Sequence, residues 1–179
     1  MILSIPGSDV AEHAKTGGYL GTPYEELDCQ AFVEKVLYDL NVRKKDGTPY
    51  NWRGSNSMWR NYIKWKGTVS ECVLKFGMIP LGAFLFVVKN DGGEEAKGYH
   101  DGEGNARHVG LYLGNGEAMH SPAPGKKVCC VPYTHFTHVG LMDMIDYMTE
   151  QVYDPKTISK AEALKALEIL TKYIKEVNI

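Results

Sequence analysis

The stretch LDCQAFVEKVL, residues 27–37, has the pattern of an amphipathic helix with a cysteine in its first turn. Four of its apolar residues recur at helical spacing: Phe32, Val33, Val36 and Leu37. Cys29 falls on the same face, because positions three, four and seven apart align along a helix. Asp28 suits the N-cap position, where a carboxylate accepts a hydrogen bond from a first-turn backbone N–H. The stretch therefore predicts a helix that begins at Cys29 and buries one face.

A cysteine at the start of a helix has distinctive chemistry. Its thiol faces backbone N–H groups that lack helical partners, and the helix dipole adds positive potential, so the thiol pKa is expected to fall. Such a thiol can act as a nucleophile near neutral pH. The alternative is a structural cysteine packed with its neighbours, since free cysteines are often buried. Cys29 is therefore a candidate nucleophile whose role depends on a base beside it.

The order of patterns along the chain predicts the fold class. Helical patterns occupy 8–15, 27–37 and 55–66, where the helical spacing of Trp59 favours core packing of the tryptophans over a sugar-binding surface. After about residue 80 the segments become short, β-rich and punctuated by Gly and Pro: 83–89, 108–114, 117–121, 126–133 and 139–147. Helices followed by strands indicate an α+β fold. The polar, glycine-rich loop at 90–107 is of a length that is usually functional or mobile.

The C-terminal stretch is predicted to be separate from this domain. Ser159 and Glu162 form a capping box in front of a helical pattern. We expect a domain at 1–150 and an appended helix at 151–179. The helix would either dock on its own domain or support self-association with a second copy.

Two histidines lie on neighbouring predicted strands, His108 in HVGLYLG and His120 in EAMHS. An imidazole beside a thiol can take its proton and later protonate the leaving amine, and a third polar group fixes the tautomer of that imidazole. A lone histidine is more often a surface residue. Two histidines could also bind a metal, but no third ligand stands at a telling spacing, so neither a metal nor a cofactor is expected.

The turn between these strands decides whether the two histidines can cooperate. A plain two-residue loop at Asn115-Gly116 would place His120 on the face opposite His108, because side chains alternate along a strand. A three-residue loop, or an equivalent bulge, shifts the register by one residue. Gly110 then pairs with His120. We expect the shifted register, with both imidazoles on one face and turned toward Cys29.

Composition excludes several classes of function. The chain has 179 residues, 44% of them hydrophobic, and a net charge of −2, which suits one globular domain and gives no electrostatic case for nucleic acid or an anionic membrane surface. No apolar run is long enough to span a bilayer. Four cysteines without Cys-x-x-Cys spacing make a disulfide framework or zinc site unexpected. The N-terminus lacks signal-peptide features, so synthesis in the cytoplasm is expected.

Three segments resemble, in order and spacing, the NlpC-type papain-like cysteine peptidases of bacterial cell-wall metabolism. They are LGTPYEELDCQAFVEKV, PLGAFLFVV and HVGLYLGNGEAMHS, and the resemblance covers roughly residues 17 to 147. It implies a papain-like fold in which the nucleophile helix packs on an antiparallel β-sheet. It also implies Cys29 as nucleophile, His108 as general base and then acid, and His120 as the orienting residue. Tyr24 would lie beside the thiolate and help the Cys29 backbone N–H hold the oxyanion.

The same resemblance implies a substrate and a reaction. Family members typically cleave peptidoglycan stem peptides between γ-D-glutamate and the diamino acid, through a thioester acyl-enzyme. The segment 83–112 looks most like prophage or phage-associated members, which would reach the cell wall by phage delivery or on lysis. Two alternatives stay open: an N-acetylmuramoyl-L-alanine amidase, and a non-catalytic wall-binding or phage-structural protein on the same fold.

Three positions depart from the family pattern, two after the nucleophile and one before the first histidine. The family usually has serine and glycine after the cysteine, where this chain has Gln30 and Ala31, and it often has glycine before the histidine, where this chain has Arg107. Asp28 and Gln30 are the candidate substrate-binding residues here. Such changes alter specificity more readily than reaction class.

Overall fold

The structure, a computed structural model, describes residues 4–89 and 101–147, with 164, 167, 168 and 171 beyond them. Within residues 4–89 and 101–147, four α-helices come mostly before the strands: α1 (Gly7–Thr16), α2 (Cys29–Asp39), α3 (Ser55–Asn61) and α4 (Val69–Phe76). The main sheet uses β2 (Ile63–Thr68), β3 (Phe84–Lys89), β4 (Asn105–Gly114), β5 (Glu117–His120), β6 (Cys129–Pro132) and β7 (His138–Met142). A small parallel pair joins β1 (Ile5–Pro6) to β8 (Ile145–Asp146).

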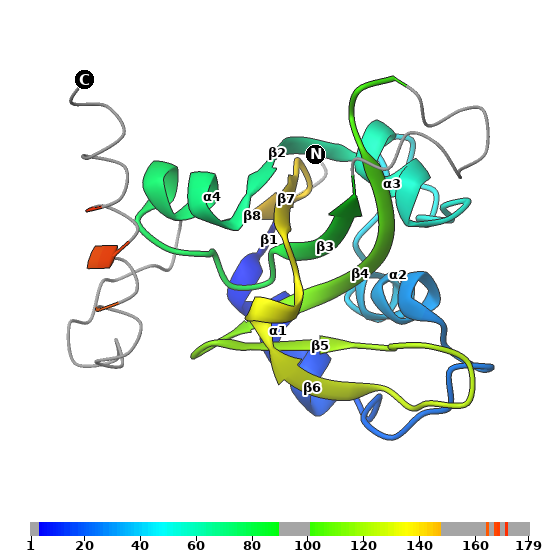
Figure 1. Cartoon of the computed structure of the whole chain (residues 1–179). Helices are drawn as coiled ribbons and strands as arrows, with labels where there is room; N and C mark the ends of the chain where they lie inside the picture. Colours follow the sequence, from blue (N-terminus) through cyan, green and yellow to red (C-terminus); the bar gives the residue numbers. More distant parts are fainter. Residues whose placement is uncertain (1–3, 90–100, 148–163, 165–166, 169–170, 172–179) are drawn as a thin grey trace.

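The main sheet is antiparallel throughout, in the order β2-β7-β3-β4-β5-β6 (Figure 1). The predicted α+β class is therefore confirmed. Within the described ranges, no helix is long and apolar enough to cross a membrane.

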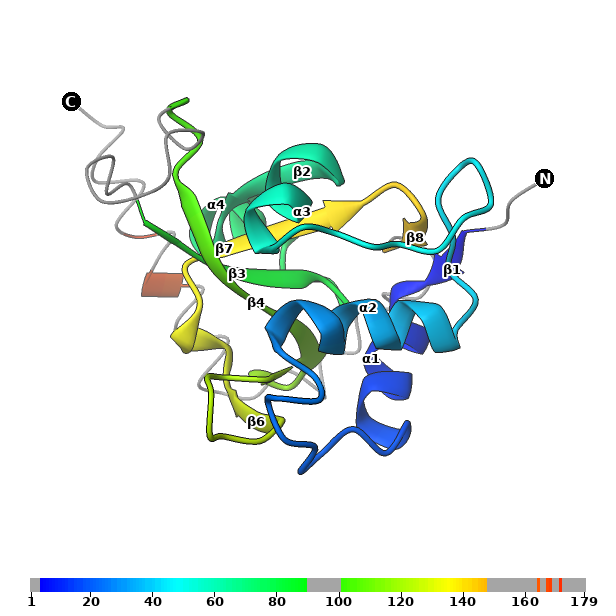
Figure 2. The same cartoon turned by 90° about the vertical axis from the view of Figure 1, so that its right-hand side faces the viewer.

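Helix α2 buries the face that its sequence pattern predicts. Its four apolar residues are fully buried, and α2 packs beside β4, with α1 next to it (Figure 2). They share one core cluster with four residues of β4 and β5: Val109, Leu111, Leu113 and Met119. Burying these side chains is the main source of free energy that holds α2 to the sheet.

The opposite face of the sheet has its own apolar cluster. Its buried members include Leu85, Tyr112, Ala118, Phe136 and Val139, with Cys72 of α4 beside them. The sheet is therefore covered on both faces, and each of the two clusters takes alternate side chains from β4 and β5.

The prediction of one helix over 55–66 is wrong in its second half. Helix α3 ends at Asn61, and β2 pairs antiparallel with β7 as an edge strand. The reason is tertiary, because strand pairing with β7 satisfies the backbone of this segment and outweighs its local helical spacing. The next helix, α4, begins at a capping box of Thr68 and Glu71, a sequence signal that the prediction missed.

The start of α2 is held in two ways. Asp28 is its N-cap, as predicted, and its Oδ1 accepts a hydrogen bond of 2.7 Å from the Ala31 backbone N–H. The segment before it, 21–24, pairs with 126–128 through three backbone hydrogen bonds of 2.8 to 2.9 Å. Helix α2 is thereby tied to the connection that follows His120.

The predicted division at residue 150 stays a prediction. The capping box of Ser159 and Glu162 lies outside the described residues, as does 90–100 of the predicted loop. Positions 164, 167, 168 and 171 are helical.

Candidate active site

Cys29 is the first residue of α2 and is half-buried. Burial raises the pKa of its thiol above the ordinary value, while the backbone N–H of Val109 acts in the opposite direction by hydrogen bonding. The N–H groups of Gln30 and Cys29 also lower the pKa, and the charge of Asp28 raises it. The thiol therefore lies against β4, next to the residue that follows His108. The expected fall in the Cys29 pKa is wrong for the free protein, because loss of solvation outweighs the helix N-terminus.

Tyr24 lies near enough to Cys29 for their charges to interact. Burial raises the pKa of its hydroxyl, and the charges of Cys29 and Asp28 add to the rise. The pairing of 21–24 with 126–128 fixes the backbone of Tyr24 in front of α2. Its position beside the thiolate and its part in holding an oxyanion stay predictions.

The β4–β5 turn combines a two-residue loop with a bulge. Gly114 pairs with Glu117 across Asn115 and Gly116, whose φ angles of 52° and 82° are those of a type I′ turn. The register then shifts between Tyr112 and Gly114, so that Tyr112 pairs with Ala118. The bulge at 113 shifts the register by one residue, as the predicted three-residue loop would have done. The predicted register shift is therefore confirmed.

This register brings the two imidazoles together on one face of the sheet. Nε2 of His108 lies 2.6 Å from Nδ1 of His120, and the ring planes meet at 76°. Gly110 lies between them in the sheet, and a Cβ added there would come within 3.0 Å of the His120 Cβ. The glycine therefore leaves the room that the histidine pair occupies.

Both imidazoles are neutral at pH 7. Burial lowers the pKa of His108 to about 4, and the neighbouring His120 adds to the effect. Burial likewise lowers the pKa of His120 to about 4, with a contribution from His135. The resting site therefore holds an uncharged thiol and two uncharged rings.

Gln30 is engaged with the chain itself. Its Nε2 donates to Glu34 and to the carbonyl of Trp52, and its Oε1 accepts from the backbone N–H of Gly54 at 2.5 Å. The side chain thus ties the segment 52–54 to the start of α2. Binding of substrate by Gln30 and Asp28 stays a prediction.

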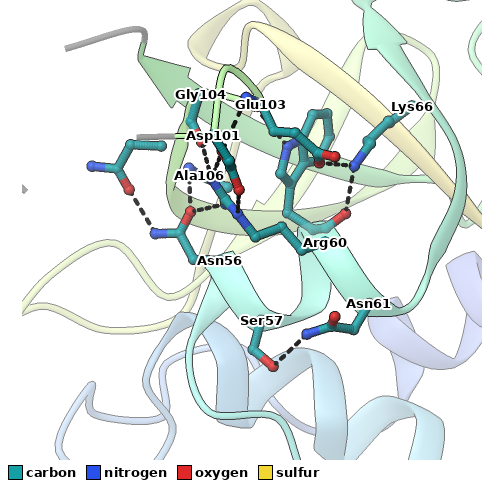
Figure 3. Close-up of polar contacts among 11 residues, drawn as sticks. Asn56, Ser57, Arg60, Asn61, Lys66, Asp101, Glu103, Gly104 and Ala106 are labelled. Carbon is teal, nitrogen blue, oxygen red and sulfur yellow. Dashed lines mark hydrogen bonds and ion pairs between the residues drawn. The ribbon is translucent and has the colours of Figure 1, made fainter. Parts of the chain in front are cut away.

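Helix α3 holds the chain just before His108 (Figure 3). Arg60 binds both carboxylate oxygens of Asp101, at 2.7 and 2.8 Å, and also the carbonyl of Gly104. Asn56 accepts from the Ala106 backbone N–H and donates to the side chain of Asn105. This network anchors the first residues of β4, so α3 helps to set the position of the strand that carries His108.

A metal centre has no support in the part of the chain that the structure describes. There, no group of three or more His, Cys, Asp or Glu side chains could hold a metal ion.

Solved structures share this architecture. An NlpC/p60 family protein from Bacillus cereus matches 83% of this chain with a TM-score of 0.51 and 20% sequence identity. The chain has the papain-like NlpC/p60 fold. It spans 42% of the length of that Bacillus chain.

Two further NlpC/p60-type matches were found. The NlpC/p60 domain of the peptidoglycan hydrolase SagA matches 76% of this chain and all of its own length, at 22% identity and a TM-score of 0.49. The peptidoglycan hydrolase RipB from Mycobacterium tuberculosis matches 79% of this chain and 67% of its own, at 18% identity and a TM-score of 0.47. No protein-family model and no curated protein matches the sequence.

Proposed function

We propose that this chain is a cysteine peptidase that hydrolyses peptidoglycan stem peptides between γ-D-glutamate and the diamino acid. One observation carries the reaction type: the Cys29 thiol lies at the Val109 N–H, beside the strand position of His108, whose ring contacts His120. The substrate class rests on the three sequence segments that resemble NlpC-type peptidases. Such a substrate places the site of action at the cell wall.

The first step moves a proton from the thiol to an imidazole. For His108 to accept it at Nδ1, the proton of its neutral ring must sit on Nε2 and be donated to Nδ1 of His120. His120 then carries its own proton on Nε2, which is buried and has no hydrogen-bond partner among the described residues. The pair thus has one tautomer that suits a base, and His120 maintains it.

The acyl transfer then proceeds through a thioester. The Cys29 sulfur attacks the γ-carbonyl of D-glutamate while its proton passes to His108. The backbone N–H of Cys29 and the hydroxyl of Tyr24 donate hydrogen bonds to the oxyanion. His108 returns the proton to the leaving amine of the diamino acid, and water, deprotonated by His108, hydrolyses the thioester.

The test is mass spectrometry of purified muropeptides incubated with the protein. A free amine on the diamino acid, with a γ-D-glutamate terminus on the other product, supports the proposal. Products with a free lactyl group on muramic acid would instead indicate an N-acetylmuramoyl-L-alanine amidase.

Two substitutions control this assay. Cys29→Ala should lower turnover by at least about 10³-fold while leaving thermal unfolding unchanged, as expected for loss of a nucleophile. Cys130→Ala removes an exposed thiol of β6 and should leave turnover unchanged. Unaltered muropeptides with the native protein would contradict the proposal and favour a binding or structural role.

A further inference from the structure

Phe136 contacts both imidazoles of the candidate site. Its ring is nearly parallel to that of His108, at 14° with 5.9 Å between centroids. It meets the ring of His120 edge-on, at 71° and 5.6 Å. Only 4% of Phe136 is exposed. One aromatic side chain therefore restricts the planes of both histidines.

Gly110 completes this arrangement from the strand. A Cβ at Gly110 would come within 2.9 Å of the Phe136 Cζ, so the tip of the phenyl ring fills the space that the glycine leaves. Phe136 and Gly110 together restrict each imidazole to one orientation on the sheet. A ring held this way loses rotational freedom before any substrate arrives.

The backbone around Phe136 is itself fixed. The Phe136 N–H donates to the carbonyl of Tyr133, which closes a 3₁₀ turn at Tyr133–His135. The N–H of Thr137 donates to the carbonyl of Phe86, and its hydroxyl accepts from the Val88 N–H. The backbone around Phe136 is thus held on one side by β3, through Thr137, and on the other by the β4–β5 turn, where the Tyr133 N–H donates to the carbonyl of Gly116.

We propose that Phe136 is a positioning residue of the thiol peptidase: its ring keeps Nε2 of His108 on Nδ1 of His120 and excludes water from the pair. This inference rests on the proposed function. Rotation of the His108 ring would break its bond to His120 and release the tautomer that leaves Nδ1 free for the thiol proton. The ring contacts of Phe136 in this site are with the two imidazoles, so it acts through them.

The ring has a second effect during turnover. When His108 accepts the thiol proton, the imidazolium lies over the face of Phe136 within the range of a cation–π contact. The titratable groups that act on the pair are His120 on His108 and, from the 3₁₀ turn, His135 on His120. The Cys29 thiol on α2 lies at the backbone N–H of Val109, next in the chain to His108. Phe136 is the uncharged side chain that packs against both imidazoles.

The test compares Phe136→Leu with Phe84→Leu. Phe84 is also fully buried in the same sheet, but it belongs to the cluster on the α2 side. Phe136→Leu should lower kcat by ~10- to 100-fold with little change in KM, the size expected for misplacement of a base. Phe84→Leu should cost stability without this effect on kcat. Phe136→Met serves the same purpose if the leucine variant fails to fold.

A second readout needs no substrate. Histidine side-chain titration by NMR should place both imidazoles near a pKa of 4 in the native protein. In Phe136→Leu both values should rise toward 6.5, because water reaches the pair, whereas Phe84→Leu should leave them in place.

The two readouts separate the inference from the proposed function. If an active native protein shows the same kcat and titration curves in both variants, Phe136 has no positioning role. The alternative result is that the native protein cleaves no muropeptide while the pKa values of His108 and His120 rise only in Phe136→Leu. That result would support the positioning of the histidine pair by Phe136 and contradict the peptidase proposal.

Discussion

Nε2 of His108 lies 2.6 Å from Nδ1 of His120, although twelve positions separate the two residues along the chain. The contact exists because a bulge at 113 shifts the β4–β5 register by one residue after a tight turn. Without that shift, the alternation of side chains would put the two rings on opposite faces of the sheet. A single hydrogen bond joins the rings, so the tautomer of one determines that of the other.

His108 and His120 should contribute unequally to catalysis. His108→Ala should lower kcat/KM by about 10³-fold or more, and His120→Ala by about 10- to 100-fold, because the first removes the base and the second its orienting partner. His120→Gln should retain more activity than His120→Ala, since its amide oxygen can accept the Nε2–H of His108. Muropeptide kinetics check this order. Equal losses in His108→Ala and His120→Ala would contradict the separate roles.

Cys29 should not be hyper-reactive in the free protein. Burial raises the pKa of its thiol, so its alkylation by iodoacetamide should become fast only above the ordinary cysteine value of about 8.5. Below that pH, the exposed Cys130 should react at least as quickly. Mass spectrometry of each labelled cysteine across a pH series measures both rates. An inflection for Cys29 well below that value would instead show a thiolate stabilised in the resting site.

Gly110→Ala should disrupt the histidine pair. The added Cβ would come within 2.8 Å of the Met119 carbonyl oxygen and 3.0 Å of the His120 Cβ, so β5 must move. We expect a loss of about 1–3 kcal/mol in the free energy of unfolding and a fall in kcat.

Gly140→Ala is the matched control for this change. Its Cβ would come within 2.9 Å of Ile63 and of Phe86, on the same sheet but away from the histidines. It should lower stability by a similar amount and leave the kcat of the folded protein unchanged. If both variants lose kcat alike, crowding at Gly110 is not specific to the pair.

The histidine pair should make stability depend on pH. Both imidazoles have a pKa of about 4 in the folded protein and an ordinary value of 6.5. Between these values the unfolded chain binds protons that the folded chain does not, so the free energy of unfolding falls as pH falls from 6.5 to 4. Urea unfolding across this window measures the slope. The double variant His108→Gln/His120→Gln should decline less steeply. Burial also lowers the pKa of His138, which is present in both proteins and contributes the same pH dependence to each.

The local sequence determined the elements that carry the chemistry. The apolar spacing of 27–37 and the N-cap at Asp28 specify a helix that begins at Cys29, because capping and a single apolar face act within a few residues. The register that joins the histidines was also predicted from the sequence. The prediction followed from the alternation of side chains, because His108 and His120 can share a face only if the register shifts by one residue after the turn.

Only the tertiary structure decided the properties that depend on distant neighbours. Residues 63–68 form a strand because they pair with β7. The spacing of their own apolar residues does not predict a strand. The Cys29 pKa rises because the fold removes water from the thiol, a cost that no local pattern reveals. Phe136 reaches the histidines from a turn after β6, and Gln30 turns to a segment more than twenty residues away. Burial and contacts between remote segments form only when the whole chain folds. The orientation of the site's side chains and their pKa values therefore depend on the tertiary structure.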